Sequence, residues 1–444
     1  MRRRDLLRAS AAWTAASYSR VFGANDRVRI AGLGVGGRAT YLLGLASKAE
    51  NTQIVAVCDV SEPRRVAAKE KFAPGGKAYV DYREVLERTD IDAVVIGAPD
   101  HWHVPMTVDA CNAGKDVYVE KPLTHVHREG EWMLDAATTH KRIVQVGTQQ
   151  RSGRHYQRAR TLIRDGQIGD VRGASIGAFR NITPGFTTPV GSPLSPAQWD
   201  MWLGPAPKVP FDPARSLYHF RWFNDYSGGQ TTNLLAHEID IVQWVTGEIP
   251  ARVAAFAQRR SLTGYGETPD VLDAIFEYPT FLASWSSREV AAGGKGGLEI
   301  YGTKGTLSIN RRGFEITPDR ALTPESQIPR FTQPQAETGP VTYRTEGVKD
   351  EGYDQVRDQF QPHVRNFLDA IKSRQPPASD LTTAHQTSLA CHLANIAARL
   401  GRVVRWDAAA NAIAGDPEAN ALLTKTYRAP WDRELASVVK VSRA

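Results

Sequence analysis

The chain has 444 residues, of which 41% are apolar and 23% are charged, and its formal net charge at pH 7 is +7. This composition is that of an ordinary globular protein long enough for two domains. Residues 1–24 contain five arginines and one aspartate, so the remaining residues carry a net charge of only +3, too small for a nucleic-acid-binding surface. The three cysteines, Cys58, Cys111 and Cys391, have neither the spacing of a metal site nor that of a disulfide framework.

Residues 1–24 resemble a twin-arginine export signal. Arg3 and Arg4 lie in a basic start, and a short, mildly apolar run follows at Ala9–Ala16. This run is too short to cross a membrane, and no later run of 18 apolar residues follows in the sequence. We therefore expect a periplasmic protein that is exported already folded. The alternative interpretation is a disordered basic tail.

Residues 25–148 alternate between apolar strands and helix-forming stretches, which predicts right-handed βαβ units and a parallel sheet. The first strand runs into a turn in which Gly32, Gly34 and Gly37 match the pattern G-x-G-x-x-G. In dinucleotide-binding domains the first glycine permits the tight turn, the second admits a pyrophosphate, and the third lets helix and strand pack closely. The alternative is a purely structural turn.

The next predicted strand, residues 53–58, ends at Asp59, about 20 residues beyond the glycines. A carboxylate at this position can accept hydrogen bonds from both hydroxyls of an adenosine ribose, which favours NAD over NADP. Arg64 and Arg65 follow nearby and leave room for a ribose 2′-phosphate as the alternative.

Three further strands are predicted at residues 93–96, 116–119 and 142–147. In an open parallel sheet, ligands bind beyond the carboxyl ends of the strands. Polar residues follow each of these strands, at Asp100–His103, Glu120–Lys121 and Thr148–Arg151. The sequence therefore predicts that the chemistry takes place at this edge of the sheet.

Lys121 is the candidate acid–base group at this edge. It precedes a proline, and the residue before a proline is pushed towards extended geometry. Beside a cationic nicotinamide, burial and like charge would both disfavour the ammonium form, so the neutral amine could remove a proton from a hydroxyl group. Taken by itself, however, Lys121 is better interpreted as a lysine in a surface turn.

The rest of the chain, residues 149–444, is expected to form a second, α/β domain. Its β-like runs follow one another without a helix between each pair, which predicts an open, mostly antiparallel sheet with one face free for packing. These runs are residues 171–179, 252–259, 273–278, 281–286, 298–301 and 306–310. Helices are expected at residues 155–164, 363–372 and 382–400, followed by an irregular tail. Residues 184–217 and 318–350 are expected to be surface excursions.

A second group of polar residues lies at residues 227–240. On a helix capped by a threonine at its start, Asn233, His237 and Asp240 would share one face. Such a stripe is unusual on an otherwise apolar helix, and His237 is a candidate proton relay whose ring Asp240 would orient. The alternative is a hydrogen-bonded histidine in the core. A metal site is less favoured, because the H-x-H at residues 101–103 has no acidic or cysteine partner at ligand spacing.

Together these motifs resemble the Gfo/Idh/MocA oxidoreductase family. The resemblance rests on the glycine turn with Asp59, on Ala98–His103, on Glu120–Pro122 and on Gly228–Asp240, and it extends from about residue 26 to Trp431. It implies a Rossmann domain followed by an α/β domain, a nicotinamide cofactor, a sugar or cyclitol substrate and a homo-oligomer formed through the open sheet.

The resemblance also assigns roles to single residues. Lys121 and His237 occupy the positions of the family's lysine and histidine. The acid that family members often place four residues before the histidine is Asn233 here, and asparagine cannot take a proton. Either Asp240 and Lys121 then carry the acid–base work, or Asn233 only holds a substrate hydroxyl.

The complete set of candidate residues falls into three groups. The catalytic candidates are Lys121, His237, Asp240 and Asn233. The cofactor-binding candidates are Gly32, Gly34, Gly36, Gly37, Arg38, Asp59, Pro99, Asp100, His103, Glu120, Lys121 and Gln149. The substrate-binding candidates are Lys121, Arg151, Tyr156, Arg180, Trp222, Asn233 and His237. Aromatic rings such as that of Trp222 can stack on the C–H faces of sugars. No metal is expected.

We interpret the sequence as that of a periplasmic NAD-dependent oxidoreductase that acts on a secondary alcohol of a sugar, glycoside or cyclitol. The first alternative is an NAD-dependent glycoside hydrolase or lyase that passes through a transient keto-sugar and recycles a tightly bound cofactor. The second is a non-catalytic sugar or nucleotide sensor, which would leave Lys121 and His237 without a role.

Overall fold

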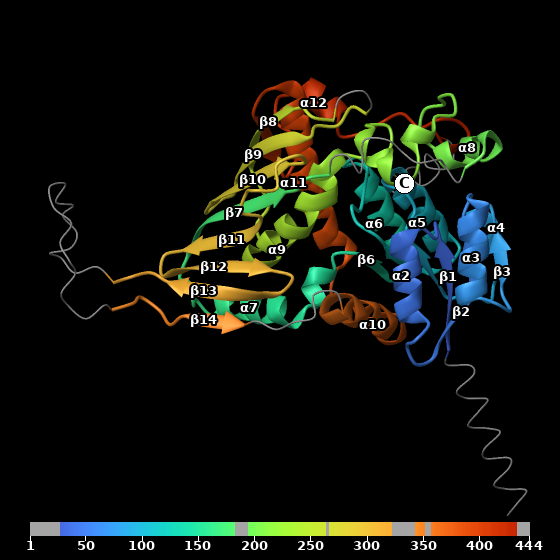
Figure 1. Cartoon of the computed structure of the whole chain (residues 1–444), viewed down its shortest axis with the longest axis horizontal. Helices are drawn as coiled ribbons and strands as arrows, with labels where there is room; N and C mark the ends of the chain where they lie inside the picture. The colour runs from blue at the N-terminus through green and yellow to red at the C-terminus, as the bar shows by residue number, and fades with distance from the viewer. Residues whose placement is uncertain (1–26, 183–193, 263–265, 322–341, 351–356, 433–444) are drawn as a thin grey trace, which may run out of the picture.

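The computed structural model describes residues 27–182, 194–262, 266–321, 342–350 and 357–432 (Figure 1). The predicted export signal and most of the predicted excursion at 318–350 lie outside these ranges. Within them, none of the helices combines the length and the apolar character that a membrane crossing requires.

Alternating strands and helices near the N-terminus form the predicted parallel sheet, in the order β3-β2-β1-β4-β5-β6. Its strands are β1 (Val28–Leu33), β2 (Thr52–Cys58), β3 (Lys77–Tyr79), β4 (Ala93–Ile96), β5 (Asp116–Val119) and β6 (Val144–Val146). The helices between them are α2 (Gly37–Ala46), α3 (Glu62–Phe72), α4 (Tyr82–Leu86), α5 (His103–Asn112) and α6 (Glu129–Thr139). The four residues of β4 are all buried, because helices cover both faces of the sheet. The strand order and the crossover helices are those of a Rossmann fold.

The second sheet has ten strands, in the order β14-β13-β12-β11-β7-β10-β9-β8-β15-β16. Its strands are β7 (Val171–Phe179), β8 (Arg252–Gln258), β9 (Val271–Glu277), β10 (Leu282–Arg288), β11 (Gly297–Gly302), β12 (Gly305–Asn310), β13 (Gly313–Pro318), β14 (Val348–Asp350), β15 (Val404–Asp407) and β16 (Ala412–Ile413). Among the described strands of this second sheet, only β7 and β10 pair in parallel, so the prediction of a mostly antiparallel sheet is confirmed.

The two faces of this sheet have different surroundings. Helices α7 (Arg154–Arg164), α9 (Ala236–Thr246) and α11 (Leu381–Leu400) pack between the sheet and the Rossmann domain (Figure 1). Strand residues that face them are buried, in alternation with exposed ones. The opposite face exposes large apolar side chains, including Phe256, which is 78% exposed, and Leu282, which is 54% exposed.

Helix α10 (Arg357–Ser373) belongs to the second half of the chain but packs on the Rossmann side. Phe360, Phe367 and Leu368 share one buried cluster with residues of β1, β2 and β5. The ring of Phe367 meets that of Tyr118 edge-on, with 5.8 Å between the ring centroids. The Rossmann core is thus completed by a segment more than 200 residues downstream of its last strand.

The excursion expected at residues 184–217 is not a plain surface loop in its described part. It contains helix α8 (Pro196–Leu203), which begins with a capping box at Ser195 and buries Trp199 and Trp202. The two indole rings stack with centroids 4.8 Å apart. The prediction failed because apolar residues are sparse in this stretch, while its two tryptophans contribute a large buried area.

The irregular tail expected after residue 400 is also folded in its described part, as β15, β16 and α12 (Pro417–Ala421). Beyond α12 the chain crosses back to the Rossmann domain. Arg428 donates hydrogen bonds to the carbonyl of Gly204 (2.9 Å) and to Asp200 of α8 (2.7 Å). Trp431 packs edge-on against Trp102, with centroids 4.9 Å apart. This segment therefore connects α8 to the Rossmann domain.

Candidate active site

The glycine-rich turn connects β1 to α2 and forms one wall of a cavity. Gly34 has a φ of 71°, and a Cβ atom added to it would lie 2.6 Å from the backbone of Ala98. A residue with a side chain is therefore excluded there by both conformation and space. Gly32 serves packing instead, because a Cβ atom at this residue would lie 2.6 Å from Leu43 of α2. A Cβ atom at Gly37 would meet nothing within 4 Å, so the close contact expected at the third glycine is made by the first.

The start of α2 can accept an anion. None of the described side chains caps its first turn, which also contains no acidic residue. The backbone N–H groups at a helix N-terminus attract phosphate when no side chain satisfies them. Gly36 and Gly37 line the cavity; a Cβ atom at Gly37 would have open space around it, and one at Gly36 would meet only the guanidinium of Arg64, at 3.6 Å. The residues present therefore fit the pyrophosphate of a dinucleotide.

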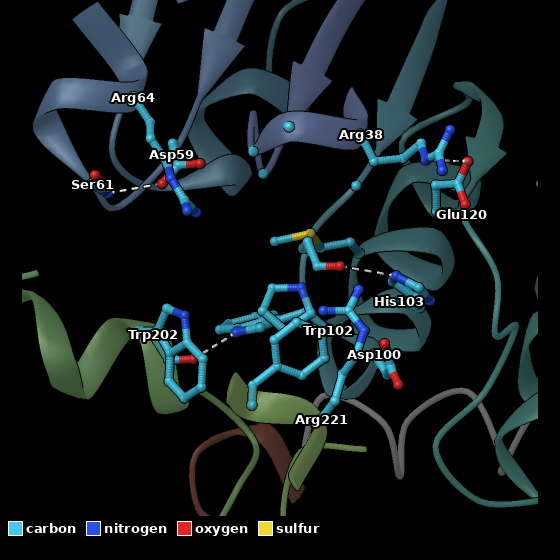
Figure 2. Close-up of a pocket in the computed structure, with 18 of the residues that line it drawn as sticks. Arg38, Asp59, Ser61, Arg64, Asp100, Trp102, His103, Glu120, Trp202 and Arg221 are labelled. Atoms are coloured by element: carbon cyan, nitrogen blue, oxygen red, sulfur yellow. Dashed lines mark hydrogen bonds and ion pairs between the residues drawn. The ribbon is translucent and has the colours of Figure 1, made fainter. Parts of the chain in front are cut away.

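Asp59 lies at the end of β2, on the side of the cavity where an adenosine ribose belongs (Figure 2). One of its carboxylate oxygens accepts a hydrogen bond from the backbone N–H of Ser61 (2.8 Å). Burial raises the pKa of the Asp59 carboxyl, while this N–H and the nearby Arg64 and Arg65 oppose the rise. Arg65 is turned back on the carbonyl of Asp59 (2.7 Å), whereas Arg64 lines the cavity.

The carboxyl ends of β4 and β5 supply the next wall of the cavity, and their polar groups are held in place. His103 directs both ring nitrogens at carbonyl oxygens, those of Pro122 (2.7 Å) and Ala98 (3.0 Å). Ser227 donates to the buried carboxylate of Asp100 (2.6 Å), and this bond connects the Rossmann domain to the second half of the chain.

Glu120 anchors the same wall at the end of β5. Gln149 donates to its carboxylate (2.8 Å), and the guanidinium of Arg38 lies 3.9 Å from it (Figure 2). Gln149 supports Glu120 from behind and is not among the residues that line the cavity. The lining of the cavity therefore does not support the predicted direct contact of Gln149 with the cofactor.

Lys121 faces the second domain across the cavity. Its Nζ donates to the backbone carbonyl of Asn233 (2.6 Å) and to the side-chain Oδ1 of the same residue (2.8 Å). The pKa of Lys121 is lowered to about 7, mainly by burial; the nearby Arg221 and Arg38 contribute to the shift, while Glu120 and Asp100 oppose it. Because two of its N–H bonds point at Asn233, the third tetrahedral position of the amine is left for a substrate.

Asn233 can receive the lysine because the helix is irregular at this point. Residues Thr231–Leu235 form a π-helical turn before α9 begins. Such a turn replaces the regular i→i+4 ladder by a wider one, and π-turns occur often at functional sites. The backbone carbonyl of Asn233 is one of the two acceptors of Lys121.

His237 lies one turn further along and lines the same cavity. The ring is 7% exposed, and burial holds its pKa well below the ordinary value, with Lys121 and Arg311 adding to the effect. The imidazole is therefore neutral near pH 7. Its Nδ1 is buried and has no hydrogen-bond partner within the described part of the chain.

Asp240 does not orient His237, and the prediction of that contact is wrong. Its carboxylate forms a bidentate ion pair with Arg151 (2.7 and 2.8 Å) and accepts a third hydrogen bond from Thr387 (2.8 Å). Asp240 is completely buried and Arg151 is 2% exposed. Neither lines the cavity, so the predicted catalytic role of Asp240 and the substrate contact of Arg151 are both replaced by a structural ion pair.

Two further substrate candidates are also found in the core. Tyr156 packs in the cluster beneath the second sheet, and its hydroxyl accepts a hydrogen bond from Gln150 (2.6 Å). Trp222 is fully buried among the aromatic residues around α8. In both residues the large apolar area of the ring is buried by packing against other side chains. Of the remaining candidates, Arg180, Asn233 and His237 line the cavity.

The wall of the cavity that the second half of the chain provides was not predicted as one surface. It comes from α8 and from the 3₁₀ segment Leu217–Trp222, which contribute Met201, Trp202, Phe220 and Arg221. Figure 2 shows Trp202 and Arg221 on this side of the cavity. Arg311, in the turn between β12 and β13, reaches the cavity from the second sheet. The tryptophan-rich stretch was the only sequence signal for this wall, because turn residues follow no periodic pattern.

Comparison with known proteins agrees with this geometry. Residues 27–148 match the model of an oxidoreductase family with an NAD-binding Rossmann fold. Residues 208–308 match a GFO/IDH/MocA C-terminal domain, and residues 351–433 match a C-terminal α/β domain of the same oxidoreductase family.

Individual relatives include two curated proteins and a solved structure. An inositol 2-dehydrogenase of Salmonella typhimurium is 33% identical over 236 residues, which are 52% of this chain and 58% of that protein. A glycosyl hydrolase family 109 protein of Shewanella sp. is 30% identical over 154 residues, 33% of this chain and 34% of that protein. The structure of scyllo-inositol dehydrogenase from Lactobacillus casei, with bound NAD(H) and scyllo-inositol, has a TM-score of 0.61 at 19% identity and covers 85% of this chain and 99% of its own.

The buried ion pair predicts that Asp240→Ala destabilises the protein instead of impairing catalysis directly. Removal of one partner of a buried pair leaves the other charge without compensation and costs about 3–5 kcal/mol. Unfolding in denaturant should show a loss of this size in the free energy of unfolding. The control is Asp165→Ala, at an exposed residue at the end of α7, and it should change the free energy of unfolding very little. A stable Asp240→Ala protein that has lost all turnover would instead support the catalytic role.

Proposed function

Because this chain belongs to the GFO/IDH/MocA oxidoreductase family, we propose that it is an NAD-dependent enzyme that oxidises a secondary alcohol of a sugar, glycoside or cyclitol, with Lys121 as its acid–base group. The observation that carries this proposal is the geometry of the Lys121 amine. It is half-buried, has a pKa of about 7, is held by two acceptors on Asn233, and faces the cavity that the glycine-rich turn also lines.

The chain's own residues provide distinct sites for the parts of the cofactor. The start of α2 would hold the pyrophosphate, and Asp59 would accept the hydroxyls of the adenosine ribose. This acceptor, with Arg65 turned away from the cavity, supports NAD over NADP. When bound, the nicotinamide accepts the hydride from the substrate carbon.

The side chains around the substrate position divide the remaining work. The neutral amine of Lys121 takes the hydroxyl proton from the carbon that is oxidised, and its ammonium form returns a proton in the reverse direction. His237, neutral near pH 7, lies in position to hydrogen-bond the same or a neighbouring hydroxyl. Asn233 cannot exchange a proton, so it serves to orient the lysine.

A second candidate function is redox-neutral glycoside cleavage, in which a transient keto-sugar makes a neighbouring C–H acidic and the aglycone is eliminated before the hydride returns. The cavity wall formed by α8 supports it. Trp202 and Phe220 face the cavity from the second domain, and the aromatic cluster around them includes Val60 of the Rossmann domain. A cofactor enclosed between these walls would stay bound through a complete cycle. The similarity to the family 109 glycosyl hydrolase points in the same direction.

One experiment separates the two functions. Purified protein is incubated with a panel of free sugars, inositols and nitrophenyl glycosides, with and without added NAD, while the absorbance at 340 nm and the released aglycone are recorded together. Net oxidation gives NADH in proportion to product. Redox-neutral cleavage gives aglycone without a lasting 340 nm signal and without added NAD.

We propose two further properties of the whole protein. Export by the twin-arginine route would deliver a folded, cofactor-loaded enzyme to the periplasm; it rests on Arg3 and Arg4, which lie outside the described residues. Association of copies through the second sheet is supported by the apolar side chains on its open face, where Phe256, Ile275 and Leu282 are exposed.

The cofactor prediction is that the folded protein retains NAD(H) through gel filtration. Heat-released supernatant analysed by mass spectrometry should contain NAD(H) and no NADP(H). Asp59→Ala should weaken NAD binding by roughly 10–100-fold, because hydrogen bonds to a charged group contribute about 1.5–3 kcal/mol. The matched control Asp170→Ala removes an exposed aspartate far from the cavity. Recovery of NADP(H) would overturn the assignment.

The Lys121→Ala variant should lose about 10²–10⁴-fold in turnover while retaining the dinucleotide. In the wild type, oxidation requires the neutral amine, so kcat/KM should rise with pH through about pH 7 and then level off. The reverse reduction, which requires the ammonium form, should show the opposite slope. Lys48→Ala, an exposed lysine of the same domain, is the control. Full activity of Lys121→Ala would refute the mechanism.

The export prediction concerns Arg3 and Arg4. Replacement of both by lysine should leave precursor in the cytoplasm, because this route reads the arginine pair itself and not its charge. Immunoblots of periplasmic and cytoplasmic fractions would measure it, with Arg20→Lys as the control. Unimpaired delivery of the double variant would disprove the assignment.

A further inference from the structure

A chain of hydrogen bonds leads from Lys121 away from the cavity into the second domain. Lys121 Nζ donates to Asn233 Oδ1 (2.8 Å), and Asn233 Nδ2 donates to Gln230 Oε1 (2.8 Å). Gln230 Nε2 in turn donates to Glu289 Oε2 (3.2 Å). Glu289 follows β10, is completely buried, and also accepts from Arg180 at both oxygens.

The two ends of this chain determine its direction. An ammonium group or an amine held by two acceptors presents N–H groups, whereas an ionised carboxylate can only accept. Each amide between them must therefore present its oxygen towards Lys121 and its NH₂ group towards Glu289. Without the acceptor at Glu289, the NH₂ group of Gln230 would lose its hydrogen-bond partner, and the Gln230 amide could flip. A flip of Gln230 would in turn favour a flip of Asn233, whose N–H groups would then face the N–H groups of Lys121.

We propose that Glu289 is a positioning residue for Lys121: acting through Gln230 and Asn233, its carboxylate keeps the Asn233 oxygen turned towards the lysine amine, which leaves the third position of that amine open to the substrate. This inference rests on the proposed function of Lys121 as the acid–base group. It also gives the asparagine at this position a role that does not require a proton.

The backbone holds the middle of the chain in place. Gln230 follows Gly229, whose φ is 68° and where a Cβ atom would lie 2.8 Å from Thr268. Asn233 belongs to the π-turn, which also directs its carbonyl at Lys121. Gln230 and Asn233 are both buried. Water therefore competes little for these amides, and each unmade bond would leave a buried polar group unsatisfied.

The charges around Lys121 and Glu289 are consistent with a coupling between the two residues through this chain of hydrogen bonds. Lys121 faces Glu120, Asp100, Arg221 and Arg38, and the last two disfavour its ammonium form. Around Glu289, burial raises the pKa of the carboxyl and Asp270 adds to the rise, whereas Arg180 and Gln230 oppose it. Loss of the Glu289 charge would remove one compensating charge from Arg180, which lies on the same side as Lys121.

The test measures the titration of Lys121 in two independent ways. The first is the pH dependence of kcat/KM, and the second is the pH dependence of the acetylation rate of Lys121 by acetic anhydride, followed by mass spectrometry on the holoenzyme. In Glu289→Gln, loss of negative charge disfavours the ammonium form, so both midpoints should move to lower pH by roughly half to one unit. Turnover at the pH optimum should also fall, with KM little changed.

A second variant and a control complete the design. Gln230→Leu cuts the chain without altering any charge, and it should reduce kcat about tenfold while moving both midpoints less than Glu289→Gln does. Glu87→Gln removes an exposed carboxylate of the Rossmann domain and should change neither readout.

The outcomes distinguish this inference from the proposed function. Unchanged midpoints and unchanged kcat in both variants, in an enzyme whose wild type shows the pH dependence, would overturn the positioning role alone. A wild type without turnover whose Lys121 labelling midpoint still shifts in Glu289→Gln would overturn the proposed function and retain the coupling. If Glu289→Gln fails to fold, an unchanged kcat in Gln230→Leu would be sufficient to reject the inference.

Discussion

The site depends on one contact between the two halves of the chain, that of the Lys121 amine with Asn233. Lys121 follows a strand of the Rossmann sheet, whereas Asn233 belongs to the π-turn that precedes α9, and 112 residues separate them. An amine that is partly shielded from water needs acceptors, and here two are provided by one residue of the other domain. The relative placement of the domains and the chemical state of the lysine are therefore determined together.

Much of the fold was predictable because its signals are local. The strands of both sheets alternate or are uniformly apolar, and the glycine turn must adopt the conformation that Gly34 shows. Among the strands missed, β3 and β14 are short, lie at the edges of the sheets and bury few residues. Helix α8 was missed because the contact of Trp199 with Trp202, which stabilises it, produces no periodic pattern of apolar residues in the sequence.

The site was predictable at the strand ends and less so on the helix. Asn233, His237 and Asp240 were expected on one face because a regular helix was assumed. The π-turn widens the helix at Thr231–Leu235, and the carboxylate of Asp240 points towards Arg151 and Thr387 in the core. A single sequence contains no signal for such a turn. Arg151 was assigned wrongly for a related reason. An arginine in a buried ion pair and an arginine that binds a ligand look the same in a sequence.

The segment that carries Arg428 and Trp431 has a consequence for the order in which the cofactor cavity is built. The glycine turn and Asp59 belong to the first third of the chain, but α8 is tied to the Rossmann domain by contacts from residues near the end of the described structure. During synthesis from the N-terminus, the glycine turn and Asp59 are therefore made long before the segment that secures the outer wall of the cavity. The cavity can be completed only after the chain has been synthesised as far as Trp431.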